Sequence, residues 1–253
     1  MNLHYEKYGD HSQKLIILHG LFGSADNWTS IGKQLSRRFT VFLIDQRNHG
    51  KSPHDPLWNY DTMAHDLKEF ILKHEIDNPI IIGHSMGGKT AMKFACTYPT
   101  LLKQLIVVDI SPKHYPVHHK TIIEGLQSVA KQKVESRKQA DQILQKYIPE
   151  LPVRQFLIKN LLREDTSMRW RMNLDVIDTN IENVGEALLE DESTTTPTLF
   201  IRGSISDYIL DTDETLITKH FPKSTLETVN NAGHWLHAEQ PKTFLTLVEK
   251  FTE

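Results

Sequence analysis

The sequence has 253 residues, enough for one large domain with a sizeable core, or for a core with a small insertion. The net charge of -3 gives no reason to expect nucleic acid as a partner, and no basic block suggests a membrane surface. The single cysteine, Cys96, excludes an internal disulfide, and no apolar run approaches the ~20 residues of a membrane-spanning helix. Because the first residues also lack an apolar signal region, we expect a cytoplasmic protein without membrane partners. Nothing here indicates its oligomeric state.

Strand-like and helix-like segments alternate over most of the chain. Strand-like runs, most of them continuous and apolar as in buried parallel strands, occur at 14–19, 41–45, 79–82, 105–108, 197–202 and 224–229, after an alternating edge strand at 3–8. Helical patterns occur between them at 27–37, 60–74, 86–95, 213–220 and 241–251. This alternation predicts an α/β fold, with a mostly parallel sheet and helices on both of its faces.

The alternation is interrupted between residues 113 and 189. Strand-like runs are absent there, and the segment is polar and amphipathic. Helical patterns occur near 120–133, 137–147, 153–160 and 181–189. Because such a segment cannot continue the alternation, we expect a helical cap inserted into the core. The predicted division is a core of residues 1–112 and 190–253 and a cap of residues 113–189.

Five residues between a predicted strand and a predicted helix carry the clearest chemical signal. Gly83-His84-Ser85-Met86-Gly87 fits G-x-S-x-G, the nucleophile elbow, in which a sharp strand-to-helix turn exposes one serine. Side chains two positions either side of the serine would collide in so tight a turn, and Gly83 and Gly87 have none. We expect Ser85 to be a nucleophile. The alternative is a glycine-rich turn with an incidental serine.

Motifs at the ends of the predicted strands resemble those of a known family. They read H-G-L-F-G-S from residue 19, D-Q-R-N-H-G-K-S from 45, G-H-S-M-G-G-K from 83, V-V-D-I-S-P from 107 and N-A-G-H-W from 231. Together they resemble an α/β-hydrolase, most closely the YbfF group of bacterial esterases. The resemblance implies the α/β-hydrolase fold with a small helical lid, and a serine esterase or thioesterase acting on acyl substrates. We expect no metal and no cofactor.

Serine chemistry needs a base and a pair of oxyanion donors. A serine hydroxyl is scarcely ionised near neutral pH, so it depends on a neighbouring base. His234 follows the tight turn after the last predicted strand and is the expected base; the alternative is a histidine that caps the last helix. Two backbone N–H groups must stabilise the oxyanion. We expect one from Met86 and the other from Leu21 or Phe22.

The acid of the triad has three candidates. Many family members place it three residues beyond Gly203, but that position is Ser206 in this sequence. Asp207 comes one step later, and Asp175 of the cap is another candidate. The resemblance to the YbfF group implies Asp109, at the end of the preceding strand, with Ser206 as a fourth polar member. We favour Asp109, and the other two stay open.

The substrate expected from this chemistry is a small-molecule acyl ester or acyl thioester. Its acyl pocket should be lined by His19, His84, Trp235, Leu157 and Leu161, although ordinary core packing explains each of them equally well. Other functions remain open for this fold. They are a carbon–carbon bond hydrolase, a cofactor-free haloperoxidase and a ligand-binding protein without turnover.

Overall fold

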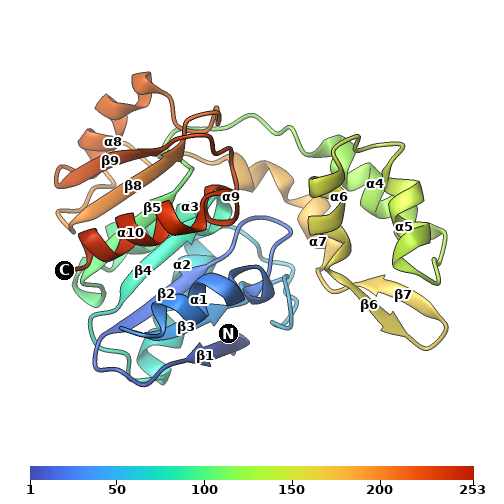
Figure 1. Ribbon diagram of the computed structural model, residues 1–253, viewed down its shortest axis with the longest axis horizontal. Helices are drawn as coiled ribbons and strands as arrows, with labels where there is room; N and C mark the ends of the chain where they lie inside the picture. The colour runs from blue at the N-terminus through green and yellow to red at the C-terminus, as the bar shows by residue number, and fades with distance from the viewer.

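Seven strands form one sheet in the computed structural model, which describes all residues from Met1 to Glu253. The strand order is β1-β3-β2-β4-β5-β8-β9 (Figure 1). The bounds are Tyr5–Tyr8 (β1), Lys14–Leu18 (β2), Thr40–Ile44 (β3), Ile80–His84 (β4), Gln104–Val108 (β5), Thr198–Gly203 (β8) and Ser224–Val229 (β9). Only β1 is antiparallel to its neighbour. The carboxyl ends of the other six strands therefore meet at one edge, where sheets of this kind bind ligands.

Helices cover both faces of the sheet. Their bounds are Thr29–Leu35 (α1), Tyr60–Lys73 (α2), Met86–Thr97 (α3), Glu214–His220 (α8), Leu236–Glu239 (α9) and Pro241–Phe251 (α10), with short 3-10 turns at Ala25–Trp28, Pro99–Leu101 and Asp211–Asp213. Side chains alternate along each strand, so Ile16 and Leu18 pack in one apolar cluster with α2 and α3, whereas Leu15 and Ile17 pack with α1 and α10. The α/β fold predicted from the sequence is confirmed. None of the helices combines the length and apolar character needed to cross a bilayer.

Residues 113–189, which we call the cap, form a separate group of elements between β5 and β8 (Figure 1). The elements are Lys120–Lys131 (α4), Arg137–Leu144 (α5), Leu151–Ile158 (α6), Leu161–Glu164 (β6), Ser167–Trp170 (β7), Leu174–Thr179 (α7) and the 3-10 helix Ile181–Gly185 (η3). Their buried side chains form a third apolar cluster, which also includes Leu21, Trp58 and Met86. Because Met86 directly follows Ser85, the cap packs at the edge of the sheet that carries this serine.

The prediction that strands are absent from the cap is wrong, because β6 and β7 form an antiparallel hairpin. Leu161 and Trp170 lie opposite each other and are buried, whereas Arg169 is exposed. The strands are only four residues long and carry several charges, so the sequence resembles a polar loop. The turn contains Asp165 at φ 52° and lacks the glycine that usually marks such a turn.

The helix predicted at 181–189 is wrong beyond Gly185. After η3 the chain runs beside the segment that leads from β5 into the cap. Tyr115 N–H donates to the carbonyl of Gly185 at 2.8 Å, and Leu188 N–H donates to the carbonyl of Pro112 at 3.0 Å. A Cβ on Gly185 would lie 2.0 Å from the carbonyl oxygen of Tyr115. This close approach of two chain segments requires glycine and ends the helical turn.

The buried side chain of Lys89 fastens both ends of the cap to α3. Its Nζ donates to the carbonyls of Lys113 at 2.5 Å and of Glu186 at 2.7 Å. Burial, together with the nearby charge of Lys113, lowers the pKa of Lys89 to about 7. The two carbonyls compensate for part of this loss of hydration, and they hold the ends of the cap next to the helix that follows Ser85.

Candidate active site

Ser85 occupies the turn between β4 and α3. Its backbone has φ 53° and ψ -119°, a conformation that residues other than glycine rarely adopt. The N–H of Ser85 donates to the carbonyl of Val108 on β5 at 3.0 Å, which continues the sheet pairing into the turn. A Cβ on Gly83 would lie 2.2 Å from the carbonyl oxygen of Gly87, and one on Gly87 would lie 2.4 Å from the carbonyl oxygen of Leu18, so both glycines are needed for this geometry. The turn therefore has the form of a nucleophile elbow.

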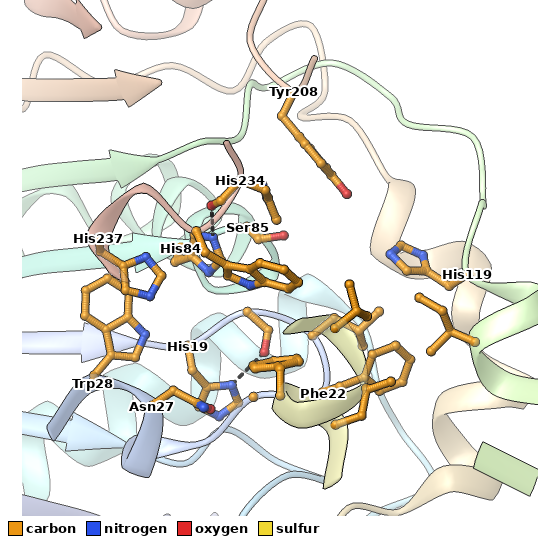
Figure 2. A pocket seen from close by; sticks show the side chains of 18 of the residues that line it. His19, Phe22, Asn27, Trp28, His84, Ser85, His119, Tyr208, His234 and His237 are labelled. Atoms are coloured by element: carbon orange, nitrogen blue, oxygen red, sulfur yellow. Dashed lines mark hydrogen bonds between the residues drawn. The ribbon is translucent and has the colours of Figure 1, made fainter. Parts of the chain in front are cut away.

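His234 and Asp109 are joined by a direct hydrogen bond. His234 Nδ1 lies 2.8 Å from Asp109 Oδ2, and the carboxylate is fully buried. The same carboxylate accepts the N–H of Gly203 at 3.1 Å and the hydroxyl of Ser206. Because an ionised carboxylate only accepts, His234 carries its proton on Nδ1, and Nε2 is left free to accept another. Ser85 and His234 line the same cavity (Figure 2).

The other two candidate acids do not contact His234. Asp207 is exposed in the loop after β8, and Asp175 is exposed on α7 of the cap. Neither side chain takes part in the ion pair that Asp109 forms with His234. Asp109 is thus the one candidate whose geometry suits an acid that orients the imidazole.

Two further aromatic residues hold His234, and sequence reasoning identified neither contact. The ring of Tyr208 stacks on the imidazole with a centroid distance of 3.9 Å and an interplanar angle of 18°. His84 Nε2 donates to the carbonyl of His234 at 2.9 Å. Tyr208 lies two residues beyond Ser206 in a loop at the carboxyl end of a strand. This position in the sequence could have identified Tyr208 as a site residue.

The predicted oxyanion donors differ in their availability. Met86 begins α3, where the N–H groups of the first turn have no carbonyl partner within the helix. The N–H of Leu21 pairs with no backbone carbonyl. In contrast, the N–H of Phe22 donates to His49 Nε2 at 3.2 Å. Leu21 is therefore the better of the two candidates in this loop.

A cavity of about 230 Å³ opens at Ser85 and is mostly apolar. Four of the five predicted pocket residues line it: His19, His84, Leu157 and Trp235. Leu161 was predicted wrongly. Helix α6 ends at Ile158, and the chain then turns into β6, which places the Leu161 side chain in the interior of the cap.

The sequence prediction also missed several residues that line the cavity. The main ones are Trp28, Ile122, Val153, Phe156 and His237. Three of the apolar lining residues, Val153, Phe156 and Leu157, share one face of α6 at helical spacing. This periodicity is visible in the sequence, but only the folded cap shows that the face points toward Ser85.

Several histidines near the cavity are held in the neutral form. Burial lowers the pKa of His49, His119 and His237 to about 3. It also lowers the pKa of His19 and His84. An unfolded histidine has a pKa of about 6.5, so below that pH the unfolded chain binds more protons than the folded chain. Stability contributed by these residues is present above pH 6.5 and is lost as the pH falls toward 3.

We therefore expect the free energy of unfolding to decrease between pH 7 and pH 4.5, by up to about 1.4 kcal/mol per pH unit for each such histidine. Urea unfolding at several pH values measures this. His237→Phe should reduce the slope, because His237 is buried and its Nδ1 has no hydrogen-bond partner. His65→Gln is the control, since the His65 side chain is 57% exposed. Equal slopes in both variants would contradict the prediction.

Comparison with known proteins agrees with this geometry. The family model for the alpha/beta hydrolase fold matches residues 14–241. The sn-1-specific diacylglycerol lipase ABHD11 of Danio rerio is 39% identical to this chain, in a match that covers 100% of this chain and 83% of the lipase. Esterase YbfF of Escherichia coli is 33% identical over 94% of this chain and 92% of its own. A solved structure of a marine microorganism esterase has a TM-score of 0.95 and 45% identity, and the match covers 98% of each chain.

The relatives named above are lipases and esterases. Matches of this identity and coverage confirm the resemblance to the YbfF group that the sequence motifs indicated. The chain belongs to the α/β-hydrolase family, among its carboxylic ester hydrolases.

Proposed function

We propose that this chain hydrolyses carboxylic esters or thioesters of acyl substrates through an acyl-enzyme on Ser85. The observation that carries the proposal is the bond between His234 and the buried Asp109, because His234 lines the same cavity as the strained Ser85. An incidental serine in a glycine-rich turn would need neither group beside it. The esterase and lipase names of the relatives support the ester as the bond that is cleaved.

In the first half of the reaction, Ser85 Oγ attacks the carbonyl carbon while His234 Nε2 accepts the hydroxyl proton. A bond forms between Oγ and carbon, and the carbonyl electron pair moves onto oxygen, where the N–H groups of Leu21 and Met86 stabilise it. Collapse of this intermediate breaks the bond to the alcohol or thiol, which takes the proton from His234. Asp109 stays ionised and stabilises the imidazolium.

In the second half, water attacks the acyl group on Ser85, and His234 again accepts the proton. The bond between Oγ and the acyl carbon breaks, the carboxylic acid leaves, and the proton returns to the serine. A mostly apolar cavity suits an acyl substrate, because a few polar groups fix the reacting bond while the lining accommodates the chain. We propose that the cap sets the preferred chain length.

The contribution of the cap can be measured at Phe156. This side chain lines the cavity from α6, and its ring centroid lies 5.5 Å from that of Trp235. Phe156→Ala should enlarge the cavity and raise the ratio of kcat/KM for long over short acyl esters by about tenfold. The measurement is a series of p-nitrophenyl esters. Leu151→Ala is the control because Leu151 is exposed on the same helix, and an unchanged ratio for Phe156→Ala would contradict this role.

The test of the proposed function is labelling by a fluorophosphonate probe together with a screen of acyl esters and acyl-CoA thioesters by chain length. We expect labelling of one serine and hydrolysis of at least one ester series. A protein that takes the label but hydrolyses no ester would indicate another hydrolase reaction, such as cleavage of a carbon–carbon bond. A protein that neither takes the label nor hydrolyses any substrate would be a ligand-binding member of the family.

A further inference from the structure

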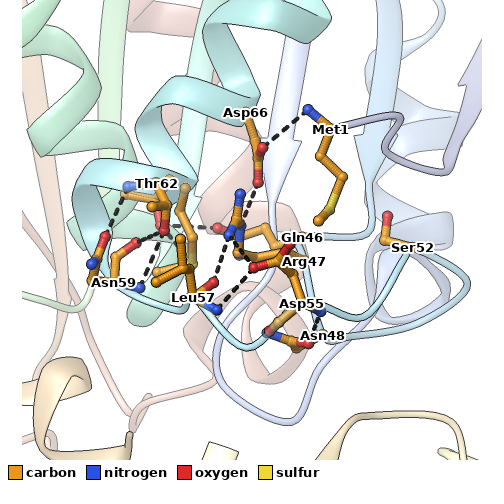
Figure 3. Close-up of polar contacts among 12 residues, drawn as sticks. Met1, Gln46, Arg47, Asn48, Ser52, Asp55, Leu57, Asn59, Thr62 and Asp66 are labelled. Carbon is orange, nitrogen blue, oxygen red and sulfur yellow. Dashed lines mark hydrogen bonds and ion pairs between the residues drawn. The ribbon is translucent and has the colours of Figure 1, made fainter. Parts of the chain in front are cut away.

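The loop after β3, residues 45–52, takes no part in the proposed chemistry, yet almost all of its residues are buried. We call it the β3 loop. The Nε of Arg47 donates to Asp66 on α2 at 2.5 Å, and its guanidinium also donates to the carbonyl of Leu57 at 2.5 Å (Figure 3). Arg47 is itself almost fully buried. The β3 loop is thus bonded to α2 and to the segment that precedes this helix.

The β3 loop bonds repeatedly to residues 19–25, the loop that carries the proposed oxyanion donor, which we call the oxyanion loop. Asp45 Oδ1 accepts the N–H of Ala25 at 2.7 Å. The Gln46 amide donates to the carbonyl of His19 at 2.7 Å, and the N–H of Gln46 donates to His19 Nε2 at 3.1 Å. Both ends of the oxyanion loop are therefore fixed to the β3 loop.

The middle of the oxyanion loop is strained at Phe22, which has φ 59° without being glycine. Its N–H donates to His49 Nε2 at 3.2 Å, while His49 Nδ1 donates to the carbonyl of Arg47 at 3.0 Å. These two bonds require the neutral Nδ1–H tautomer. Burial lowers the pKa of His49 to about 3, so Nε2 remains an acceptor near neutral pH.

The carbonyl of the same Phe22 is held by the cap. Asn160, the second residue after α6, donates from its side-chain amide to this carbonyl at 2.6 Å. Asn160 is 3% exposed, and its own carbonyl accepts the N–H of Arg171 at 2.8 Å. The strained residue is therefore bonded on one side by the core and on the other by the cap.

We propose that His49 and Asn160 are positioning residues that hold the Leu21 N–H in the oxyanion hole, so that the hole is complete only when the cap is docked. His49 bonds to the N–H of the peptide group between Leu21 and Phe22. Asn160 bonds to the carbonyl of the next peptide group, between Phe22 and Gly23. Release of either bond lets the strained Phe22 relax and turns the adjoining Leu21 away. This inference rests on the proposed function, because it assigns a role within the same site.

Four single variants test the proposal. Asn160→Leu and His49→Leu each remove one bond to Phe22, whereas His49→Gln keeps an acceptor and a donor. Asn183→Leu is the matched control. The Asn183 amide also bonds the cap to the core, because it donates to the carbonyl of Trp58 at 2.8 Å, but it forms no bond to the oxyanion loop. Each variant is assayed for kcat and KM on an aryl ester, and for inhibition by an aryl trifluoromethyl ketone, whose adduct with serine places an oxyanion in the hole.

We expect Asn160→Leu and His49→Leu to lose about 10- to 100-fold in kcat and in affinity for the ketone, with KM changed by less than about threefold. His49→Gln should recover most of the loss, and Asn183→Leu should stay within about threefold of wild type. A role in stability alone would not produce a selective loss of affinity for the oxyanion-forming inhibitor.

Wild-type kcat and ketone affinity in a folded Asn160→Leu protein, verified by circular dichroism and urea unfolding, would overturn the proposal. Losses in Asn183→Leu equal to those in Asn160→Leu would also overturn it, because they would indicate cap docking in general. If His49→Leu does not fold, Asn160→Leu and His49→Gln decide the question. Failure of this inference leaves wild-type hydrolysis and labelling of Ser85 intact, whereas failure of the proposed function removes them.

Discussion

Ser85→Ala is expected to reduce kcat for an aryl acetate by about 10⁶-fold, the loss seen when the nucleophile of a serine-protease triad is removed. The methyl group of alanine cannot form the acyl-enzyme, and only the oxyanion donors and substrate binding then remain. The variant should fold normally, because the strained turn depends on Gly83 and Gly87 and not on the serine hydroxyl. Steady-state kinetics and urea unfolding measure the two effects separately.

The activity that remains in Ser85→Ala decides whether this prediction holds. Without a triad nucleophile, an enzyme of this type retains about 10³- to 10⁴-fold acceleration over the uncatalysed reaction. A folded Ser85→Ala protein with turnover well above that level would show that another group attacks the ester. The fluorophosphonate probe should also fail to label this variant.

Asp109→Asn is expected to lower kcat by about 10⁴-fold, with the His234 ring still in place. The carboxylate holds the proton of His234 on Nδ1 through a 2.8 Å bond. An amide in its place can donate to Nδ1 and so move the proton to Nε2, the nitrogen that must accept it from Ser85. Ser206→Ala should weaken turnover less, because it removes only the hydroxyl that donates to Asp109.

Asp207→Asn is the matched control for this experiment, since Asp207 is an exposed aspartate close to Ser206. Its effect on kcat should be mild. If Asp207→Asn were as damaging as Ser85→Ala while Asp109→Asn stayed active, the acid would lie after β8, at the place common in the family. The assignment of Asp109 would then be wrong.

Much of the core could be predicted because its strands are buried on both faces. Ile80, Ile81 and Ile82 are all inaccessible to solvent, and this kind of burial leaves a continuous apolar run in the sequence. The nucleophile elbow could also be predicted from the sequence, because its motif lies within five consecutive residues. Asp109 could be named as a candidate because it ends a predicted strand and because the resemblance to the YbfF group implies it.

The cap was harder to predict because tertiary packing decides its structure. Leu157 and Leu161 stand four residues apart and would share one face of a continuous helix. The helix ends at Ile158, so the second leucine moves into the cap interior. The bond between Asn160 and Phe22 joins residues 138 positions apart, and no periodicity in either segment indicates it. The stacking of Tyr208 on His234 depends likewise on how two loops meet.

Identification of the acylated residue tests the central claim most directly. The enzyme is mixed with an excess of an aryl ester, quenched in acid within the first turnovers and digested, and the peptides are analysed by mass spectrometry. We predict that the acyl group is found on Ser85, that it disappears as substrate is exhausted, and that it forms more slowly in Asp109→Asn, where attack on the ester is slow. Sustained hydrolysis with no acyl group on Ser85, or with the acyl group on another residue, would contradict the account.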